Sequence, residues 1–471
     1  MCSNGSGCGT TEDLMPEEPK IDLKEDKLCP RCNINVGEVV LRSKDIYCKP
    51  CLLHYLNHKF RAALGKSKLM RPQDKALIAF SGSHSSMSLL HLMHEGMQLS
   101  SHKRILFSVC VVYIDDGSVA KLSISERRKL NSAVEASMSK FEHYFMCIEQ
   151  SLEAHQHATL YSSAEELPLD KYTEEDGGEL NKLFETVTTL SSRQYLLQTL
   201  RQNLLTQAAK KLNCTKIFTA ETQTDLATKI IANIALGKGA HVPLDVGFSD
   251  DRTGDLITLR PLRDFSSKEV IYYNLFNDLA AIHVPSLATL VSAAIHVPSL
   301  ATLVSTIIHV PSLATLAEPL GSLQKAAESF VSDLQTNFPS TVSTVFRTAD
   351  KLSLDFSSLD PAKNCALCKA PLDTRSDLAS SSMGATKFSR LVSNATREEL
   401  NTIQVTSSDD VTSQATSTGS EGLQSGLCYA CQYVIKDMKS SQEGVGEEIL
   451  KKALEEESVT AMENQIKDFI L

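Results

Sequence analysis

Eight of the thirteen cysteines in this chain form four Cys-x-x-Cys pairs, a residue type and spacing suited to metal binding. The first two pairs are Cys29 with Cys32 and Cys48 with Cys51. Two residues between cysteines let one tight turn aim both thiolates at a single ion. The fifteen residues between the pairs are enough for a hairpin that returns the second pair to the first. The pattern therefore predicts a zinc ribbon.

The other two pairs, Cys365 with Cys368 and Cys428 with Cys431, predict a second four-cysteine site. The long segment between them is rich in Ser, Thr, Asp and Gly, a composition typical of a mobile insertion. Zinc is the expected ion at both sites. Iron–sulfur ligation by the same thiolates is the main alternative, and the spacing does not exclude it.

A turn rich in glycine and serine, in the stretch "AFSGSHSS" at 79–86, has the composition of a phosphate-binding loop. Its candidate residues are Ser81, Gly82, Ser83, Ser85 and Ser86. A glycine permits close approach of a phosphate, and serine hydroxyls can donate hydrogen bonds to it. Such turns are equally common as purely structural loops, so the composition alone leaves both interpretations open.

The elements that would position this turn alternate between strands and helices, which predicts a parallel sheet covered by helices, with a ligand crevice at the carboxyl ends of its strands. The turn follows a short apolar strand and precedes an amphipathic helix. The expected strands are 75–80, 105–117, 143–150, 215–221 and 256–262, and the expected helices include 124–141, 191–213 and 224–239.

Composition sets the broader class of the protein. A chain of 471 residues with 42% hydrophobic residues can bury a sizeable core, which argues against fibrous and fully disordered classes. The net charge of −10 excludes a surface that is basic throughout, so any nucleic-acid contact must be local. The start of the chain lacks the pattern of a secretory signal, and its longest apolar run is too short to span a bilayer. We expect a cytoplasmic protein.

The order of these motifs resembles that of the PP-loop ATPases that thiolate tRNA, and in particular their non-catalytic partner subunit. The resemblance rests on the ribbon, the linker after it, the turn at 79–86 and the block "GDLITLRPLRDFSSKEVIYYNLFND" at 254–278. It covers most of residues 25–280 and resumes at about 325. It implies a PP-loop (HUP-like) doubly wound α/β fold, with an N-terminal zinc ribbon and C-terminal cysteine knuckles.

The chain departs from the catalytic members of that group at the residues that hold ATP. They carry S-G-G-x-D-S, whereas here Ser83 replaces the second glycine and Ser85 replaces the aspartate. Serine cannot neutralise magnesium as a carboxylate does, and a side chain at 83 crowds the pyrophosphate. Of a later G-H-N-x-D-D motif only Asp225 remains. The resemblance therefore implies weak or absent ATP binding.

The thiols that carry sulfur or hold an iron–sulfur cluster in catalytic relatives are also missing. A cysteine-free stretch at 191–200 and Leu259 stand at the corresponding places. Cys110, Cys147 and Cys214 lie in predicted strands or at a helix end, where buried structural thiols are expected.

The resemblance thus implies a pseudoenzyme subunit that forms a heterodimer with the catalytic thiolase. That complex would place sulfur on the wobble uridine of lysine, glutamate and glutamine tRNAs, taking the sulfur from a thiocarboxylated ubiquitin-related modifier. Two alternatives remain: an ATP-dependent tRNA-adenylating enzyme in its own right, and a zinc-dependent interaction protein unrelated to sulfur. The candidate tRNA contacts are Lys59, Arg61, Lys66, Lys68 and Arg71.

We expect seven segments. One of them, at 280–318, holds three near-identical copies of a 13-residue unit, each with a histidine, and we assign it no function. The segments are a disordered N-terminus (1–24), the ribbon (25–57), the α/β domain (58–279), the repeat (280–318), a further part of the core (319–364), the second cysteine module (365–435) and a C-terminal helix (436–471).

Overall fold

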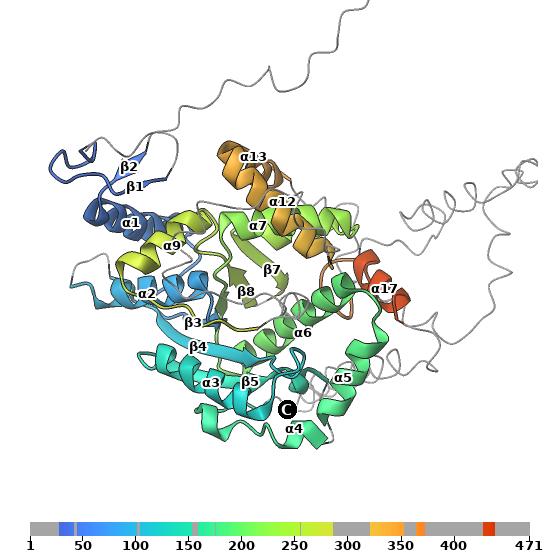
Figure 1. The fold of residues 1–471 in the computed structure, drawn as a ribbon. Coiled ribbons are helices and arrows are strands. Elements are labelled where there is room, and N and C mark those ends of the chain that lie inside the picture. Colours follow the sequence, from blue (N-terminus) through green and yellow to red (C-terminus); the bar gives the residue numbers. More distant parts are fainter. Residues whose placement is uncertain are drawn as a thin grey trace, which may run out of the picture.

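A six-stranded sheet forms the centre of the protein (Figure 1). It is seen in a computed structural model that describes residues 28–41, 45–100, 104–152, 159–174, 176–254, 256–285, 321–352, 364–372 and 427–438. The strand order is β5-β4-β3-β6-β8-β7; all neighbours are parallel except β7 and β8, which are antiparallel. The strands are β3 (Lys75–Phe80), β4 (Ser108–Asp115), β5 (Glu142–Cys147), β6 (Lys216–Phe218), β7 (Ser249–Thr253) and β8 (Leu256–Leu259).

The strands at the centre of the sheet are apolar on both faces because helices cover both. Along β4 every residue from Val109 to Asp115 is buried. Alternate positions contribute to two separate clusters: Cys110 and Val112 pack with α6, while Val109 and Val111 pack with α2. This arrangement accounts for the continuous apolar run in the sequence.

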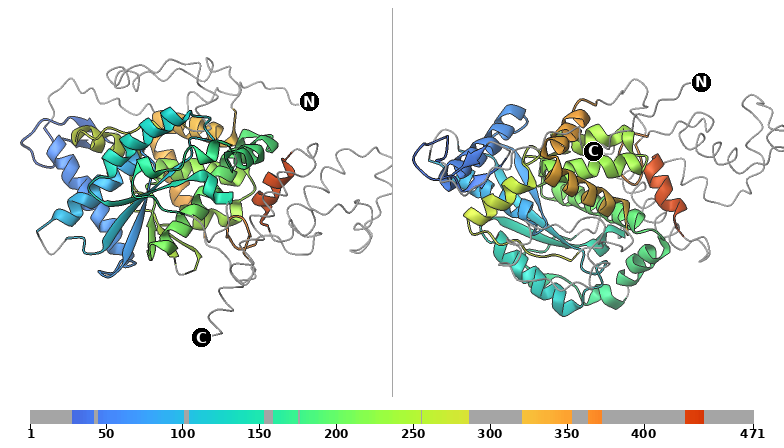
Figure 2. Two further views of the ribbon diagram at one scale, coloured as in Figure 1. Left: turned by 90° about the horizontal axis from the view of Figure 1, so that it is seen from below. Right: turned by 45° about the horizontal axis from the view of Figure 1, so that its top comes forward.

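The helices form two layers around the sheet (Figures 1 and 2). α1, α2, α3 and α9 supply side chains to the cluster on one face, and α5, α6 and α17 to the cluster on the other. α12 and α13 pack on α7. The helices are α1 (Lys49–Ser67), α2 (His84–Gln98), α3 (Ile124–Met138), α4 (Lys171–Glu174), α5 (Asp176–Thr186), α6 (Leu190–Lys211), α7 (Gln223–Ala235), α8 (Val242–Val246), α9 (Ser267–Phe276), α12 (Leu323–Asn337), α13 (Pro339–Ala349) and α17 (Tyr429–Lys436). Single 3-10 turns are η2 (Ile148–Leu152), η3 (Ala164–Glu166) and η4 (Gly239–His241).

The order of the strands reverses between β3 and β6. From β3 the chain proceeds outward through β4 and β5, then crosses back through α6 to β6 on the other side of β3. In a doubly wound sheet this point, at the carboxyl ends of the strands, is where ligands bind. The predicted doubly wound α/β fold is confirmed by this topology, and the turn at 81–83 lies at the switch point.

Several sequence expectations differ from the structure in detail. The boundary drawn at 57/58 falls inside α1, a continuous helix that joins the ribbon to the core. The antiparallel strand β7 was not expected, because its sequence "SDDRT" is polar. The segments 1–24 and 286–318, the insertion between the second pair of cysteine motifs, and the expected helix beyond 438 lie outside the described residues. Within the described part of the chain, no helix has the length and hydropathy needed to cross a membrane.

Candidate metal centres and the degenerate nucleotide loop

The N-terminal cysteine site joins a knuckle turn to the start of a helix. In the knuckle, the backbone N–H of Asn33 donates to the carbonyl of Cys29 at 2.8 Å, and Asn33 adopts a φ of 52°. A short hairpin of β1 (Val39–Val40) and β2 (Ile46–Tyr47) then leads to Cys48, which is the N-cap residue of α1. Cys51 lies in the first turn of this helix.

The C-terminal site repeats this construction. The N–H of Lys369 donates to the carbonyl of Cys365 at 2.9 Å, and Lys369 has a φ of 58°. Cys428 is the N-cap residue of α17, as Cys48 is of α1, and Cys431 follows in the first turn. The same local rules therefore produce both sites at opposite ends of the chain.

Both sets of thiols have the geometry of a site for a single metal ion. Within each set, the four sulfurs all lie within 4.8 Å of one another, and these are the two groups of possible metal ligands among the described residues. The distance from Cys32 Sγ to Cys48 Sγ is 3.7 Å, and from Cys368 Sγ to Cys428 Sγ it is 3.6 Å. A tetrahedral ion with metal–sulfur bonds of about 2.3 Å holds its sulfurs about 3.8 Å apart. A cluster distributes its thiolates over several iron atoms, which spreads the sulfurs further.

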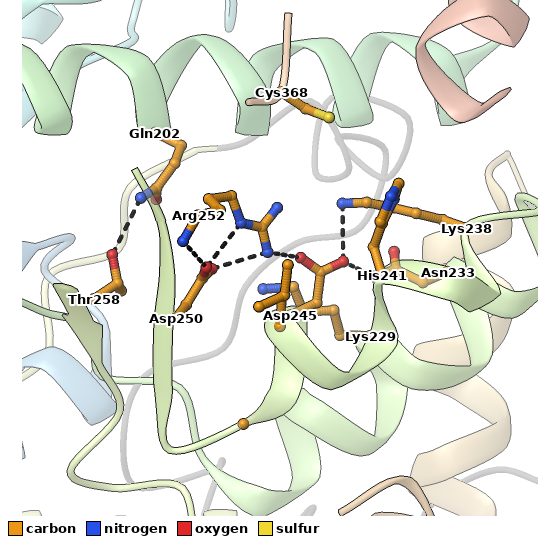
Figure 3. Close-up of polar contacts among 12 residues, drawn as sticks. Gln202, Lys229, Asn233, Lys238, His241, Asp245, Asp250, Arg252, Thr258 and Cys368 are labelled. Carbon is orange, nitrogen blue, oxygen red and sulfur yellow. Dashed lines mark hydrogen bonds and ion pairs between the residues drawn. The ribbon is translucent and has the colours of Figure 1, made fainter. Parts of the chain in front are cut away.

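A buried network of charges lies beneath the C-terminal site (Figure 3). Asp245 Oδ2 lies 2.8 Å from Lys238 Nζ, and Asp245 Oδ1 lies 2.5 Å from an Arg252 nitrogen. Lys238 also lies over the ring of Tyr195, 5.3 Å from its centroid, and the Tyr195 hydroxyl contacts Cys431 Sγ at 3.5 Å. The network thus brings a buried cation close to the thiolates, where it offsets their negative charge.

The charges in this network shift one another's pKa values. Burial by itself would raise the pKa of Asp245, but Lys238 and Arg252 outweigh it and hold that pKa well below its usual range. Hydrogen bonds from the other three cysteines, and then the ammonium of Lys238, hold the pKa of Cys368 well below its usual range. None of Lys238, Asp245 and Arg252 stood out in the sequence, because they come from three separate segments: the turn after α7, the helix α8 and the strand β7.

Backbone contacts hold the C-terminal site against the sheet domain. His241 Nε2 lies 2.7 Å from the carbonyl of Pro371, and Asn203 Nδ2 donates to the carbonyl of Leu367 at 3.1 Å. Gly237 has a φ of 75°, and a Cβ atom there would lie 2.3 Å from the ring of Tyr429. This close approach requires glycine. The site is therefore integral to the main core.

The serines of the degenerate loop bind one another and the backbone of their own helix. Ser83 is the N-cap residue of α2, and its Oγ accepts a hydrogen bond from the N–H of Ser86 at 3.3 Å. The Ser81 hydroxyl lies 3.0 Å from Ser83 Oγ and 3.3 Å from Ser86 Oγ. Ser85, at the place of the catalytic aspartate, is half-buried in the first turn of the helix. The loop thus satisfies part of its own hydrogen-bonding capacity.

The start of the repeat segment covers this loop. The N–H of Ile282 donates to the carbonyl of Gly82 at 2.9 Å. A Cβ atom on Gly82 would lie 3.2 Å from Ile282 Cβ and 3.3 Å from a methyl group of Val284. The Ile282 side chain also packs against the core cluster that contains α2. The first residues of the repeat, to which the sequence analysis assigned no function, therefore pack directly against Gly82.

The second remnant of the nucleotide motif also has a local structural role. Thr222 and Asp225 form a capping box at the start of α7, in which Asp225 Oδ2 accepts from the N–H of Thr222 at 2.9 Å. The neighbouring Glu221 contacts Lys229 at 2.8 Å and Arg260 at 2.7 Å. Although burial raises the pKa of Glu221, these two cations lower it to about 2. Its negative charge is therefore already neutralised within the protein.

The positions that lack the catalytic thiols are built into the core. The stretch at 191–200 lies within α6, and Leu259 at the end of β8 is fully buried. The expectation that Cys110, Cys147 and Cys214 are buried is confirmed. Cys110 Sγ and Cys214 Sγ lie 3.5 Å apart.

The candidate tRNA contacts divide into two groups. Lys59 Nζ lies 2.8 Å from a carboxylate oxygen of Glu269 and 4.8 Å from the centre of the Phe265 ring. Because its charge is already paired, the structure does not favour Lys59 as a phosphate ligand. Arg61 is half-buried, with Nε donating to a backbone carbonyl at 3.1 Å. The remaining three, Lys66, Lys68 and Arg71, are exposed.

Comparisons with known proteins point to one family. A family model described as cytoplasmic tRNA 2-thiolation protein 2 matches residues 322–433. The chain is 30% identical to the protein of that name from Danio rerio, covering 95% of this chain and 94% of the relative. It is also 30% identical to the Homo sapiens protein of that name, covering 83% of this chain and 80% of the relative.

One solved structure that aligns with this chain is the U34-tRNA thiolase NcsA from Methanococcus maripaludis, determined with its 4Fe-4S cluster. The alignment covers 74% of this chain and 97% of that chain, with 14% sequence identity and a TM-score of 0.45.

Proposed function

The chain belongs to the cytoplasmic tRNA 2-thiolation protein 2 family, and from this premise we propose that it serves tRNA 2-thiolation as a non-catalytic subunit. The family's name supports both a role in tRNA 2-thiolation and the cytoplasmic location expected from the sequence. The thiolated base would be the wobble uridine of lysine, glutamate and glutamine tRNAs. A catalytic PP-loop thiolase subunit would be the partner, and a thiocarboxylated ubiquitin-related modifier would supply the sulfur.

The observation that carries the non-catalytic assignment is the contact between Ile282 and Gly82. The N–H of Ile282 donates to the Gly82 carbonyl at 2.9 Å, and its Cβ lies 3.2 Å from the place of a Cβ on Gly82. This contact supports the proposal because it would hinder ATP phosphates from approaching the loop. The substitutions at Ser83 and Ser85 support the same conclusion, because a hydroxyl group is a weaker magnesium ligand than a carboxylate.

We assign one zinc ion to each four-cysteine site. The thiolate spacing at both sites supports a mononuclear ion, and tetrathiolate coordination is typical of structural zinc. The zinc would fix the knuckle to the helix at each site. Metal analysis of the purified protein should find two zinc ions per chain and no acid-labile sulfide. Acid-labile sulfide bound in proportion to the protein would overturn the zinc assignment.

The tRNA thiolation assignment is tested by nucleoside analysis of tRNA from cells that lack the protein. Wobble 2-thiouridine should be lost and should return on re-expression of the intact chain. Cys29→Ser/Cys32→Ser should fail to restore it, whereas Cys147→Ser, a buried thiol outside both metal sites, should restore it. Unchanged thiouridine in the deletion strain would reject the assignment and favour an interaction protein unrelated to sulfur.

A nucleotide-binding assay separates the proposed subunit from an adenylating enzyme. The purified protein should show no saturable binding of ATP with magnesium, because the loop is covered and lacks the acidic residue. Saturable binding, together with release of pyrophosphate in the presence of tRNA, would support the enzyme instead.

A further inference from the structure

Exposed cations gather at one edge of the central sheet, where its parallel strands begin. β5, β4, β3 and β6 lie side by side and run parallel, so their first residues share this edge. The segment that leads into each strand carries exposed lysine or arginine side chains. We call this set the basic edge: Lys66, Lys68 and Arg71 before β3, Arg104 before β4, Lys140 before β5 and Lys210 before β6.

Direct contacts between the entry segments place them together. The N–H of Ser108 donates to the carbonyl of Asp74 at 3.1 Å, and the N–H of Thr215 donates to the carbonyl of Lys75 at 3.0 Å. Lys75 Nζ in turn lies 3.3 Å from a carboxylate oxygen of Glu142. With neighbouring strands about 4.8 Å apart, the four strands span about 14 Å. A nucleic-acid double helix presents several phosphates over this length.

The carboxylates among these entry segments are already engaged. Asp74 accepts hydrogen bonds from the N–H of Arg71 at 2.7 Å and from the Thr215 hydroxyl at 3.1 Å. Glu142 pairs with Lys75. By contrast, Arg104, Lys140 and Lys210 have no ion-pair partner among the described residues. A local excess of positive charge therefore exists in a chain whose net charge is −10.

We propose that the basic edge binds the phosphate backbone of a structured RNA, and that this RNA is tRNA. Its identity as tRNA rests on the proposed function. The cations follow the row of strands, as contacts to a phosphate backbone require. If the ligand were an acidic protein instead of RNA, the interface would also need a buried apolar centre. Among the described residues, Leu106 is the large hydrophobic side chain exposed between these cations, and one such side chain is too little for that centre.

The location of the basic edge fits a subunit that holds RNA for another active site. Gly82 follows the carboxyl end of β3, whereas the basic edge lies at the amino ends of the strands, on the opposite side of the sheet. An RNA segment bound at the basic edge therefore does not contact this chain's own loop, which Ile282 already covers. The uridine is left free to enter the active site of a partner.

The test compares two triple variants of the full-length protein. Arg104→Gln/Lys140→Gln/Lys210→Gln removes three charges from the basic edge and leaves the segment 58–71 intact. Lys121→Gln/Lys129→Gln/Lys182→Gln removes three exposed charges elsewhere and serves as the control. Binding of fluorescently labelled tRNA is followed by anisotropy over a series of salt concentrations, after thermal unfolding has shown that both variants are folded.

The basic-edge variant should bind tRNA roughly tenfold more weakly, and its salt dependence should fall by about 3 in log–log slope, because each of the three lost phosphate contacts removes nearly one unit. The control should match the wild type. The proposal would be overturned if the basic-edge variant bound tRNA with the affinity and salt slope of the wild type. It would also be overturned if unlabelled polyglutamate displaced the labelled tRNA as well, per charge, as unlabelled tRNA does. Neither result would affect the thiouridine measurement, which tests the proposed function separately.

Discussion

Ser83 caps a helix at the position where active PP-loop enzymes have a glycine. Its Oγ accepts from the N–H of Ser86, which satisfies one of the free N–H groups at the start of α2. The serine that stands at the place of the glycine therefore stabilises the start of α2.

Ser83→Ala should lower the free energy of unfolding by about 1 kcal/mol, whereas Ser83→Gly should lower it by only a few tenths of a kcal/mol. Both variants lose the capping hydroxyl, but glycine readily adopts the backbone conformation of an N-cap residue and alanine does not. Urea denaturation of both variants measures the difference. Equal destabilisation by alanine and glycine would show that the hydroxyl does not act as a cap.

Asp245 is a buried carboxylate at the centre of the charge network beneath the C-terminal site. It is 3% exposed and is held between Lys238 and Arg252. Asp245→Asn should destabilise the protein by about 3 to 5 kcal/mol, because it leaves the buried Lys238 ammonium without its carboxylate partner and leaves Arg252 with Asp250 alone. Thermal and chemical unfolding measure this effect. Lys129→Gln, an exposed charge on α3, is the matched control and should have no measurable effect.

The same carboxylate predicts a dependence of stability on pH. The Lys238 and Arg252 cations hold the pKa of Asp245 in the folded protein well below its value in the unfolded chain. Its stabilisation is therefore complete above the unfolded pKa, about 3.9, and decreases as the pH falls below that value. Unfolding measured from pH 6 down to pH 3, roughly the window set by that pKa, should show a shallower loss of stability in Asp245→Asn than in the wild type. Parallel curves would contradict this account.

At the scale of elements, the contact between α17 and the loop after α7 fixes the C-terminal module. Gly237 and Gly254 have nearly equal positive φ angles of 75° and 74°, but only Gly237 has the Tyr429 ring against it. Alanine at either position incurs the same backbone strain. The comparison therefore isolates the packing of α17.

Gly237→Ala should be more destabilising than Gly254→Ala, and hydrogen exchange should increase in α17 only for the first variant. The difference in unfolding free energy should be at least about 1 kcal/mol, the usual cost of overpacking. Equal effects of the two substitutions would mean that the Tyr429 ring moves aside without any loss of stability.

The segment at 280–285 acts as an element even though it forms neither helix nor strand. Restoring the motif with Ser83→Gly/Ser85→Asp should not produce ATP binding, because Ile282 still covers Gly82. Adding Ile282→Gly/Val284→Gly should increase binding relative to the double variant. Equilibrium dialysis with labelled ATP measures both. Binding by the double variant alone would show that the covering segment is no obstacle.

At the scale of the whole molecule, the two cysteine sites differ in how they join the core. Cys365, Cys428 and Cys431 belong to the same buried cluster as α6 and the sheet. In the N-terminal site, most residues of the knuckle are exposed, and the site reaches the main core through α1 and through Val39, Leu41 and Tyr47 of the hairpin. Loss of metal should therefore have different consequences at the two ends.

Cys428→Ser should lower the free energy of unfolding of the entire protein by more than the roughly 1 kcal/mol of an average substitution, and its unfolding temperature should fall accordingly. Cys32→Ser should release one metal ion but leave the main transition nearly unchanged. Differential scanning calorimetry and metal content, measured on the same samples, test this. The same shift in both variants would contradict the difference in packing.

Local patterns in the sequence were sufficient for most of the core. The strand β3 and the helix α3 with its Ser123 cap were predictable because burial and capping each depend on residues close in the chain. The strand β7 was not predictable, because it is an edge strand with a polar sequence that is stabilised by pairing with β8. The four-cysteine sets were predictable because metal ligation fixes their spacing.

The sequence by itself determined the two four-cysteine sets and the sheet, because each follows from residue type and short-range spacing. The expected absence of the catalytic acid and thiols came from the resemblance to the PP-loop thiolases. Only the tertiary structure showed that Ile282 covers Gly82 and that Lys238 and Asp245 lie beneath the C-terminal thiols. It also showed that Lys59 is paired with Glu269. The cations that share one edge of the sheet are Arg104, Lys140 and Lys210. These contacts join residues up to about two hundred positions apart. Such pairings are set by the crossing order of strands and helices, which no local pattern encodes.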